Sequence, residues 1–171
     1  MRSKGRVKHK GRREGGAFTA IPHAVQDSEN WKRCGGTAIK LLCVLARQFN
    51  GGNNGDLCAA RKVVGPHGFS SPETLLWALR ELQHYRLIVQ TRQGGLGIGP
   101  SLYALTWHAI DECNGKLDCA ATSAPPGDWK QAVTILFKRT PRKLKQEDRA
   151  PSTEIVTVQY GNRIDMSKKA A

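Results

Sequence analysis

The chain has 171 residues, of which 39% are hydrophobic, and its 27 Lys and Arg against 14 Asp and Glu give a formal net charge of +13. This length allows one domain of ordinary size with extensions. No apolar run reaches the roughly 20 residues that a membrane-spanning helix needs. No apolar stretch follows the charged N-terminus as it would in a secretory signal, so we expect a cytoplasmic protein with no membrane partner.

The positive charge is concentrated in the two terminal segments. Residues 1–16 carry a net charge of +6, residues 17–112 carry +2 and residues 113–171 carry +5. A basic segment on a nearly neutral body suits a polyanion, because each neutralised phosphate releases counterions. Residues 1–16 lack an apolar face, so we expect a disordered basic arm that binds nucleic acid rather than a membrane-bound helix. The basic residues of this arm are Arg2, Lys4, Arg6, Lys8, Lys10, Arg12 and Arg13.

After the basic arm the composition becomes that of a folded domain. Pro22 suits the first position of a short helix within residues 18–25. Thr37 can cap the next helix, whose apolar residues recur at helical spacing as far as Phe49. So wide an apolar stripe belongs in the centre of a small core. The Asn- and Gly-rich run 50–55 ends the helix, because these residues tolerate positive φ.

Residues 56–58 predict a short edge strand and residues 59–64 predict one or two helical turns. The clearest helix start follows at Ser70-Ser71-Pro72-Glu73, which combines a Ser cap, an early Pro and a Glu three residues after the first Ser. This helix should run to about Tyr85. Its inward side is expected to carry Leu75, Leu79 and Leu82. At about 100° per residue, its outward side is expected to carry Ser70, Glu73, Thr74, Trp77, Glu81 and His84.

Two β-prone runs, residues 87–92 and 101–107, flank the Gly-rich segment 93–100 and predict a hairpin with a long flexible tip. The order of elements is therefore helix, short strand, short helix, capped helix and hairpin. This is the order of a winged helix-turn-helix domain, in which the hairpin forms the wing. We predict an α+β fold: a winged helix-turn-helix domain over residues 17–112 with basic, largely disordered N- and C-terminal extensions.

Residues 113–171 have weaker signals and are expected to form a linker and a basic C-terminal extension. Residues 120–127 are small and Pro-rich, as in a linker. An apolar stripe at helical spacing predicts a helix over residues 129–138, although this segment is also β-prone. A second β-prone run predicts a strand over residues 154–160.

No residue pattern points to a catalytic or metal site. The five cysteines include no CxxC pair and match no zinc spacing, so we expect free thiols in a reducing compartment. The histidines are scattered without a local acid or thiol partner. The glycines at 94–99 lie between two strands, whereas a phosphate-binding loop precedes a helix. We expect no cofactor, no metal and no enzymatic activity.

Five segments between Phe18 and Cys113 carry a resemblance to a known group of proteins. They are FTAIPHAV, AIKLLCVLARQFNGGNNGDL, the Ser-capped helix with its GF-SS-ETL-AL-EL pattern, LIVQTRQGG and LYALTWHAID. This part of the chain resembles the helix-turn-helix proteins of prophages and mobile elements, and is similar to the winged-helix DNA-binding domains of phage or plasmid replication initiators and regulators. The resemblance implies a nucleic-acid-binding protein, with duplex DNA as the favoured ligand, that acts in transcription control or replication of a phage or mobile element.

The predicted DNA interface has three parts. Helix 71–85 would enter the major groove, the wing would lie on a neighbouring backbone or minor groove, and the basic arm would add phosphate affinity. Trp77 has two open interpretations. It contacts a thymine methyl group or a partner protein, or it packs against the first segment or the C-terminal region. Besides the arm, the predicted contact residues are Ser70, Ser71, Thr74, Trp77, Arg80, His84, Arg92 and Gln93.

Two acidic residues weaken the DNA interpretation, because Glu73 and Glu81 on the outward face would repel phosphate. Together with an exposed Trp77 they favour an alternative, in which the chain is a protein-interaction scaffold of phage origin that binds and inhibits a host or defence complex. A third interpretation, an RNA-binding component of a ribonucleoprotein, shares the basic arms.

Overall fold

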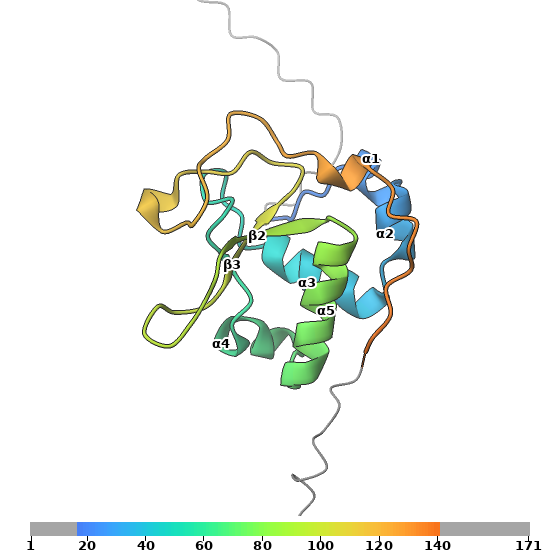
Figure 1. Cartoon of the computed structure of the whole chain (residues 1–171), viewed down its shortest axis with the longest axis horizontal. Coiled ribbons are helices and arrows are strands. Elements are labelled where there is room, and N and C mark those ends of the chain that lie inside the picture. Colours follow the sequence, from blue (N-terminus) through green and yellow to red (C-terminus); the bar gives the residue numbers. More distant parts are fainter. Residues whose placement is uncertain (1–16, 141–171) are drawn as a thin grey trace, which may run out of the picture. The chain divides into compact units, whose positions relative to one another are not determined.

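The computed structural model describes residues 17–140. The basic arm and the predicted strand 154–160 lie outside the described residues. The described part is an α+β fold with five α-helices and a three-stranded antiparallel sheet, and its element order is compatible with a winged helix (Figure 1). Residues 17–139 belong to one compact unit.

Two short helices precede the main core. α1 (His23–Gln26) follows Pro22, in agreement with the predicted start of a short helix. α2 (Glu29–Arg33) was not predicted. Its N-cap is Ser28, whose Oγ accepts a hydrogen bond from the N–H of Trp31 at 3.2 Å, which satisfies one of the free N–H groups of the first turn.

α3 (Gly36–Ala46) is the helix predicted from the wide apolar stripe, and it forms the centre of the core. The predicted cap was wrong, because the N-cap is Gly35 rather than Thr37. A carboxylate from another helix replaces the local hydroxyl: Glu81 accepts a hydrogen bond from the N–H of Gly35 at 2.7 Å. The fully buried leucines of α3 are Leu41, Leu42 and Leu45.

The two helices predicted after the first short strand are both present. α4 (Arg61–Val64) continues into the 3-10 turn η1 (Gly65–His67). α5 (Pro72–His84) begins after Ser71, the second serine of the predicted start, whose Oγ accepts a hydrogen bond from the N–H of Thr74. The predicted capped helix over residues 71–85 is therefore confirmed.

The sheet contains the predicted hairpin and one short added strand. β2 (Ile88–Arg92) and β3 (Leu102–Leu105) form the hairpin, and β1 (Leu57–Cys58) pairs with the other side of β3, so that the strand order is β1-β3-β2. A bulge interrupts the pairing of β2 with β3 near the start of the hairpin loop. In this register Leu57 lies opposite Tyr103 and Ile88 lies opposite Leu105.

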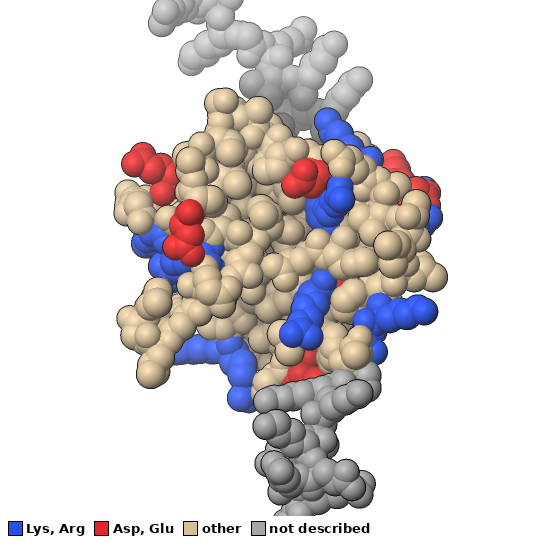
Figure 2. Space-filling model, in the orientation of Figure 1, with Lys and Arg blue, Asp and Glu red and all other residues tan. Residues whose placement is uncertain are grey.

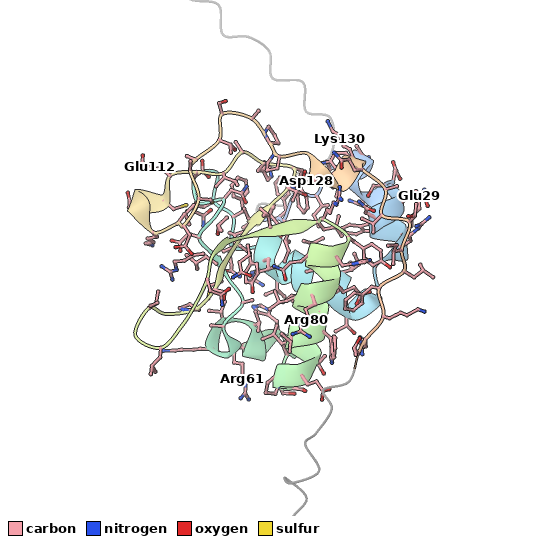
Figure 3. The ribbon with its side chains drawn as sticks, in the orientation of Figure 1. Glu29, Arg61, Arg80, Glu112, Asp128 and Lys130 are labelled. Atoms are coloured by element: carbon pink, nitrogen blue, oxygen red, sulfur yellow. The ribbon has the colours of Figure 1, made fainter. Side chains whose placement is uncertain are left out.

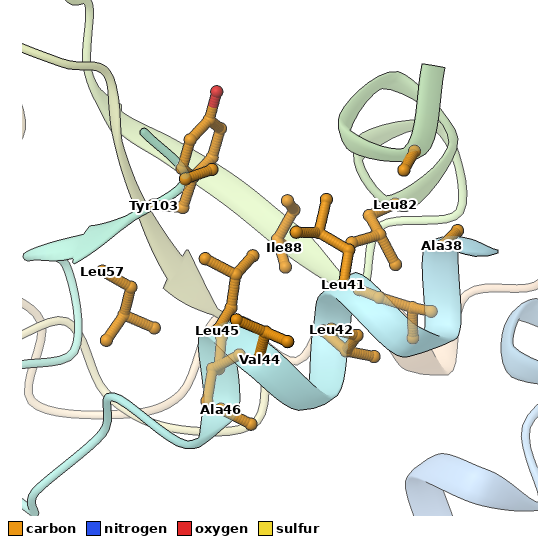
Figure 4. Packing of buried hydrophobic residues seen from close by; sticks show 14 of the residues in the cluster. Ala38, Leu41, Leu42, Val44, Leu45, Ala46, Leu57, Leu82, Ile88 and Tyr103 are labelled. Atoms are coloured by element: carbon orange, nitrogen blue, oxygen red, sulfur yellow. The ribbon is translucent and has the colours of Figure 1, made fainter. Parts of the chain in front are cut away.

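The core lies between α3, α5 and one face of the sheet (Figure 4). Leucine side chains from α3 meet those of α5 and of the sheet strands, and burial of this apolar surface is the main stabilising contribution to the fold. Residues that meet in this cluster include Leu41, Leu45, Leu57, Leu82, Ile88 and Tyr103.

Asn54 connects the Asn- and Gly-rich turn to the end of the sheet. Its fully buried side chain donates through Nδ2 to the carbonyl oxygens of Leu105, His108 and Ala109, and its Oδ1 accepts from the N–H of Leu105 at 2.7 Å. The turn that ends α3 therefore also holds the end of β3, since a buried amide with four partners is fixed in place.

The segment after the hairpin corrects two predictions. Where a helix was predicted over residues 129–138, the structure has only the single 3-10 turn η3 (Asp128–Lys130). Residues 131–139 are not helical, and we call them the C-terminal strap. The predicted domain boundary at residue 112 is also wrong, because the strap belongs to the same compact unit as the preceding elements.

Long-range hydrogen bonds explain why the strap is not helical. Asn30 donates to the carbonyl oxygens of Trp129 and Gln131, and its Oδ1 accepts from the N–H of Val133 at 2.8 Å. The hydroxyl of Tyr85 accepts from the N–H of Phe137 at 3.1 Å. These tertiary partners take the backbone groups that a helix would pair internally.

Candidate nucleic-acid interface

α5 has less free surface than its sequence indicated. The inward side carries the predicted leucines together with Ala78. A second side, predicted to face outward, is also covered: Trp77 and Glu81 are each only 8% exposed. The assignment of both residues to the outward face was therefore wrong, and two other elements of the fold explain their burial.

Glu81 lies at the start of α3. Its carboxylate accepts the hydrogen bond from Gly35, where the N-terminal end of a helix favours negative charge. Burial, with the added effect of the Glu81 charge, raises the pKa of the neighbouring Cys34 thiol to about 12. The carboxylate thus serves the fold, and it does not face a ligand that approaches α5.

Trp77 lies beneath the C-terminal strap. Its ring meets Phe137 edge to face with centroids 6.3 Å apart, and its Nε1 donates to Glu73 at 3.4 Å. The guanidinium of Arg80 lies 5.2 Å from the centre of the indole ring. Of the two interpretations of Trp77, packing against the C-terminal region is the correct one, and Trp77 is removed from the candidate interface.

His84 is also covered by the strap. Its Nε2 lies 2.8 Å from the carbonyl oxygen of Ile135, which can only accept a hydrogen bond, and its ring packs against Tyr85 and Phe137. His84 is therefore half-buried beside the strap rather than fully outward, and its contact with DNA stays a prediction. The strap occupies the part of α5 on which Trp77 and His84 lie.

One side of α5 remains open, and we call it the open stripe. Glu73, Leu76, Arg80 and Gln83 recur at spacings of three and four residues, which places them on one face of the helix. Leu76 is 44% exposed although it is apolar. Sequence reasoning included Arg80 in the site and correctly placed Glu73 on an exposed face, but it centred that face near Trp77 and so missed Leu76 and Gln83.

A chain of glutamine amides joins the open stripe to the wing. Nε2 of Gln83 donates to Oε1 of Gln90 on β2 at 3.4 Å, and Nε2 of Gln90 donates to Oε1 of Gln93 at 2.6 Å. We call these three residues the glutamine chain. Side-chain amides offer donors and acceptors that suit base edges and phosphates, so the surface from α5 to the wing is polar and continuous.

Arg92 supports the wing from within. Its guanidinium donates to the carbonyl oxygens of Pro100, at 3.1 Å, and Lys116, at 3.5 Å, and the side chain is half-buried. These bonds hold the two sides of the hairpin and the following segment together, so Arg92 has a structural role, and its contact with DNA stays a prediction. Gln93 is exposed, as the predicted contact requires.

Basic side chains gather at the loop that leads into α5. Arg61 donates to the carbonyl oxygen of Ser70 at 3.1 Å, and the ammonium of Lys40 lies 5.6 Å from the ring centre of Phe69. Lys62 is exposed next to Arg61 on α4. We call Lys40, Arg61 and Lys62 the basic rim. Sequence reasoning missed it, although the adjacent Arg and Lys on a short helix were a usable signal.

The basic rim keeps its positive charge unneutralised. Within residues 17–140, salt bridges join Lys32 and Arg33 to Glu29 and Lys116 to Asp56, and none includes the basic rim or Arg80. Figure 3 places Arg61 on α4 and Arg80 on the front of α5, and Figure 2 shows several separate Lys and Arg side chains on the lower half of this face, with an acidic group among them. The remaining predicted contacts, Ser70, Ser71 and Thr74, are exposed at the start of α5.

Comparisons with protein-family models, with curated proteins and with solved structures find no match to this chain. None of the helices in residues 17–140 combines the length and the apolar character needed to cross a membrane. The candidate interface combines cations outside any salt bridge of the described residues, side-chain amides and one exposed leucine around α4, α5 and β2.

Proposed function

We propose that the chain is a winged-helix protein that binds duplex DNA, with the open stripe of α5 in the major groove and the wing on the adjacent backbone or minor groove. The element order supports this proposal, because α4 and α5 take the places of the two helices of a helix-turn-helix and β2 and β3 take the place of the wing. The biological role that we propose is transcription control or replication of a phage or mobile element.

The observation that carries the proposal is the combination of unpaired charge and amides around one helix. The cations of the basic rim are in position to bind phosphates, and Arg80 and Gln83 can reach base edges from the open stripe. Glu73 is the acidic residue that remains on the stripe. It lies in the first turn of α5, where negative charge is favourable, and it accepts a hydrogen bond from Trp77.

The two features that favoured a protein-binding scaffold, an outward acidic face and an exposed Trp77, are not present as predicted. Glu81 is bound to the start of α3, and Trp77 is packed under the strap, so neither is available to a partner. Duplex RNA is a poorer match than DNA, because the major groove of A-form RNA is too narrow and deep for a helix such as α5.

The affinity for duplex DNA as a function of salt tests the proposal. The variant Arg61→Gln/Lys62→Gln removes two phosphate contacts and should lower the slope of log affinity against log salt by about 2. Lys32→Gln/Lys130→Gln removes the same charge from exposed positions outside the basic rim and should leave both affinity and slope unchanged. Equal losses of DNA affinity in the two variants would contradict a localised interface. Tighter binding to duplex RNA than to duplex DNA would support the RNA interpretation instead.

The basic arm contributes separately from the described domain. If all seven of its Lys and Arg contact phosphates, deletion of residues 1–16 should lower the same slope by up to about 6. Because this contribution carries no sequence information, any base preference should survive the deletion. An unchanged slope would remove the arm from the proposal but would leave the interface on α4, α5 and β2.

A further inference from the structure

The tip of the wing, residues 94–100, exposes two large apolar side chains. Leu96 is 105% exposed and Ile98 is 64% exposed. The other residues of the tip are Gly and Pro, and no charged residue lies between Arg92 and Ser101. Neither side chain is buried within the domain, so both are available to a partner outside it.

The tip is a narrow and well-supported turn. Gly95 and Gly99 pair across it, with the N–H of Gly95 donating to the carbonyl of Gly99 at 3.0 Å, and the N–H of Ile98 donates back to Gly95 at 3.2 Å. A Cβ on Gly95 would lie 3.5 Å from the side chain of Ile98, which shows that Ile98 lies over this glycine. We call residues 94–100 the blade. Leu96 is fully exposed on it, and apart from Ile98 and Pro100 the other residues of the blade are glycines.

The base of the blade is fixed at two points. Arg92 donates to the carbonyl of Pro100, and the N–H of Gly94 donates to the hydroxyl of Ser101 at 3.0 Å. The two backbones are so close here that a Cβ on Gly94 would lie 2.6 Å from the carbonyl carbon of Pro100. The blade is therefore held at one end of β2, the strand that carries Gln90 of the glutamine chain.

We propose that Leu96, supported by Ile98, inserts as an apolar wedge between two base pairs from the minor groove and bends the duplex. This inference rests on the proposed function and assigns a role to the wing within it. An apolar side chain such as Leu or Ile can partly unstack a base step, and the resulting bend brings more of the DNA against the protein. A blade of glycines suits the minor groove, which is only about 6 Å wide.

The small size of the apolar patch favours a base step over a protein. A stable protein interface buries about 800 Å² on each partner, which two side chains flanked by glycines cannot supply. A base step needs only one or two apolar side chains to be opened. The absence of acidic residues from the tip also suits approach to the phosphates on either side of the groove.

Ring closure of short DNA tests the wedge without knowledge of a preferred site. A linear duplex of about 120 bp, shorter than the persistence length of about 150 bp, is ligated into circles only slowly unless a protein bends it. The full-length protein should raise the rate of ring closure. Leu96→Ala/Ile98→Ala should bind the same fragment with most of its affinity, because phosphate contacts dominate, but ring closure should fall to the rate of free DNA.

A matched control removes two other exposed apolar side chains. Ile135→Ala/Leu136→Ala lies on the strap, where the side chains are 73% and 62% exposed, and should bend DNA as the unmodified protein does. Binding without accelerated ring closure, or equal bending by the wing variant, would overturn the wedge alone. Absence of any binding to the fragment would overturn the proposed function as well. Self-association that is lost in the wing variant would assign the tip to a second copy of the chain.

Discussion

Oε1 of Glu81, in the third turn of α5, accepts a hydrogen bond of 2.7 Å from the backbone N–H of Gly35, the residue before α3. This bond joins the two central helices and places a buried carboxylate where the α3 dipole stabilises it. It also buries this acidic residue away from the open stripe of the candidate recognition helix.

Replacement of Glu81 should therefore destabilise the fold. Glu81→Ala should lower the free energy of unfolding by about 1.5–3 kcal/mol, the range for a hydrogen bond to a charged group, whereas Glu73→Ala at an exposed position should cost less. Urea denaturation measures both. Glu81→Gln should also lower the pKa of the Cys34 thiol, which the Glu81 charge helps to raise, and the pH dependence of thiol alkylation would detect this.

Trp77 should be a stability residue. Trp77→Ala should lower the free energy of unfolding by about 3 kcal/mol, the lower end for truncation of a large aromatic side chain, because the outer side of the ring is covered only by the strap and the Arg80 side chain. Phe137→Ala should cost less, and the two losses should not add, since the rings are in contact. A Trp77→Ala protein with unchanged thermal stability but weakened DNA binding would contradict the packing described above.

The two glycines at the start of the wing tip should respond differently to substitution. Gly94→Ala would force a methyl group against the backbone of Pro100 and Ser101. It should lower the free energy of unfolding by about 1–3 kcal/mol, as overpacking does. Gly95→Ala meets only the end of the Ile98 side chain, and it serves as the matched control. Thermal unfolding of both variants checks this; equal melting temperatures would mean that the hairpin is wider at Gly94 than described.

His108 should make stability depend on pH. Its ring stacks on Phe49 with centroids 4.3 Å apart, and burial lowers its pKa below the ordinary value of 6.5 despite the nearby Asp111. Between the lowered and the ordinary pKa the unfolded chain binds the proton and the folded chain does not, so stability falls as the pH drops through this interval. Below the folded-state pKa the loss is complete.

The variant His108→Phe keeps the stacking and removes the titration. The difference in unfolding free energy between this variant and the unmodified protein should therefore grow in favour of the variant as the pH falls below about 6.5. A difference that does not change with pH would show that His108 does not titrate differently in the folded and unfolded chains.

The elements with local signals could be predicted from the sequence. The apolar stripe of α3, the Ser-Pro-Glu start of α5 and the two β-prone runs around the Gly-rich segment each depend on neighbouring residues. The strap could not be predicted, because its backbone is bound by Asn30 and Tyr85, which lie about 100 and 52 positions away in sequence. Its apolar spacing resembled a helix, but these tertiary partners determine its conformation.

The candidate interface was predicted only in part for the same reason. Arg80 and Gln93 could be selected as polar residues on the recognition helix and wing. The C-terminal strap covers Trp77 and His84, and its path could not be predicted from the sequence. The guanidinium of Arg92 donates hydrogen bonds to the carbonyl oxygens of Pro100 and Lys116. These contacts are non-local, so helical periodicity alone included the buried Trp77 and Glu81 in the open face of α5.

Photo-crosslinking from α5 to duplex DNA measures whether DNA lies on the open stripe. A crosslinking amino acid at Leu76, on the open stripe, is compared in the full-length protein with the same group at Ile135, an exposed position on the strap. If DNA lies on the open stripe, position 76 should form a crosslink to DNA and position 135 should not. A crosslink from position 135 with none from position 76 would show that DNA does not bind at the open stripe.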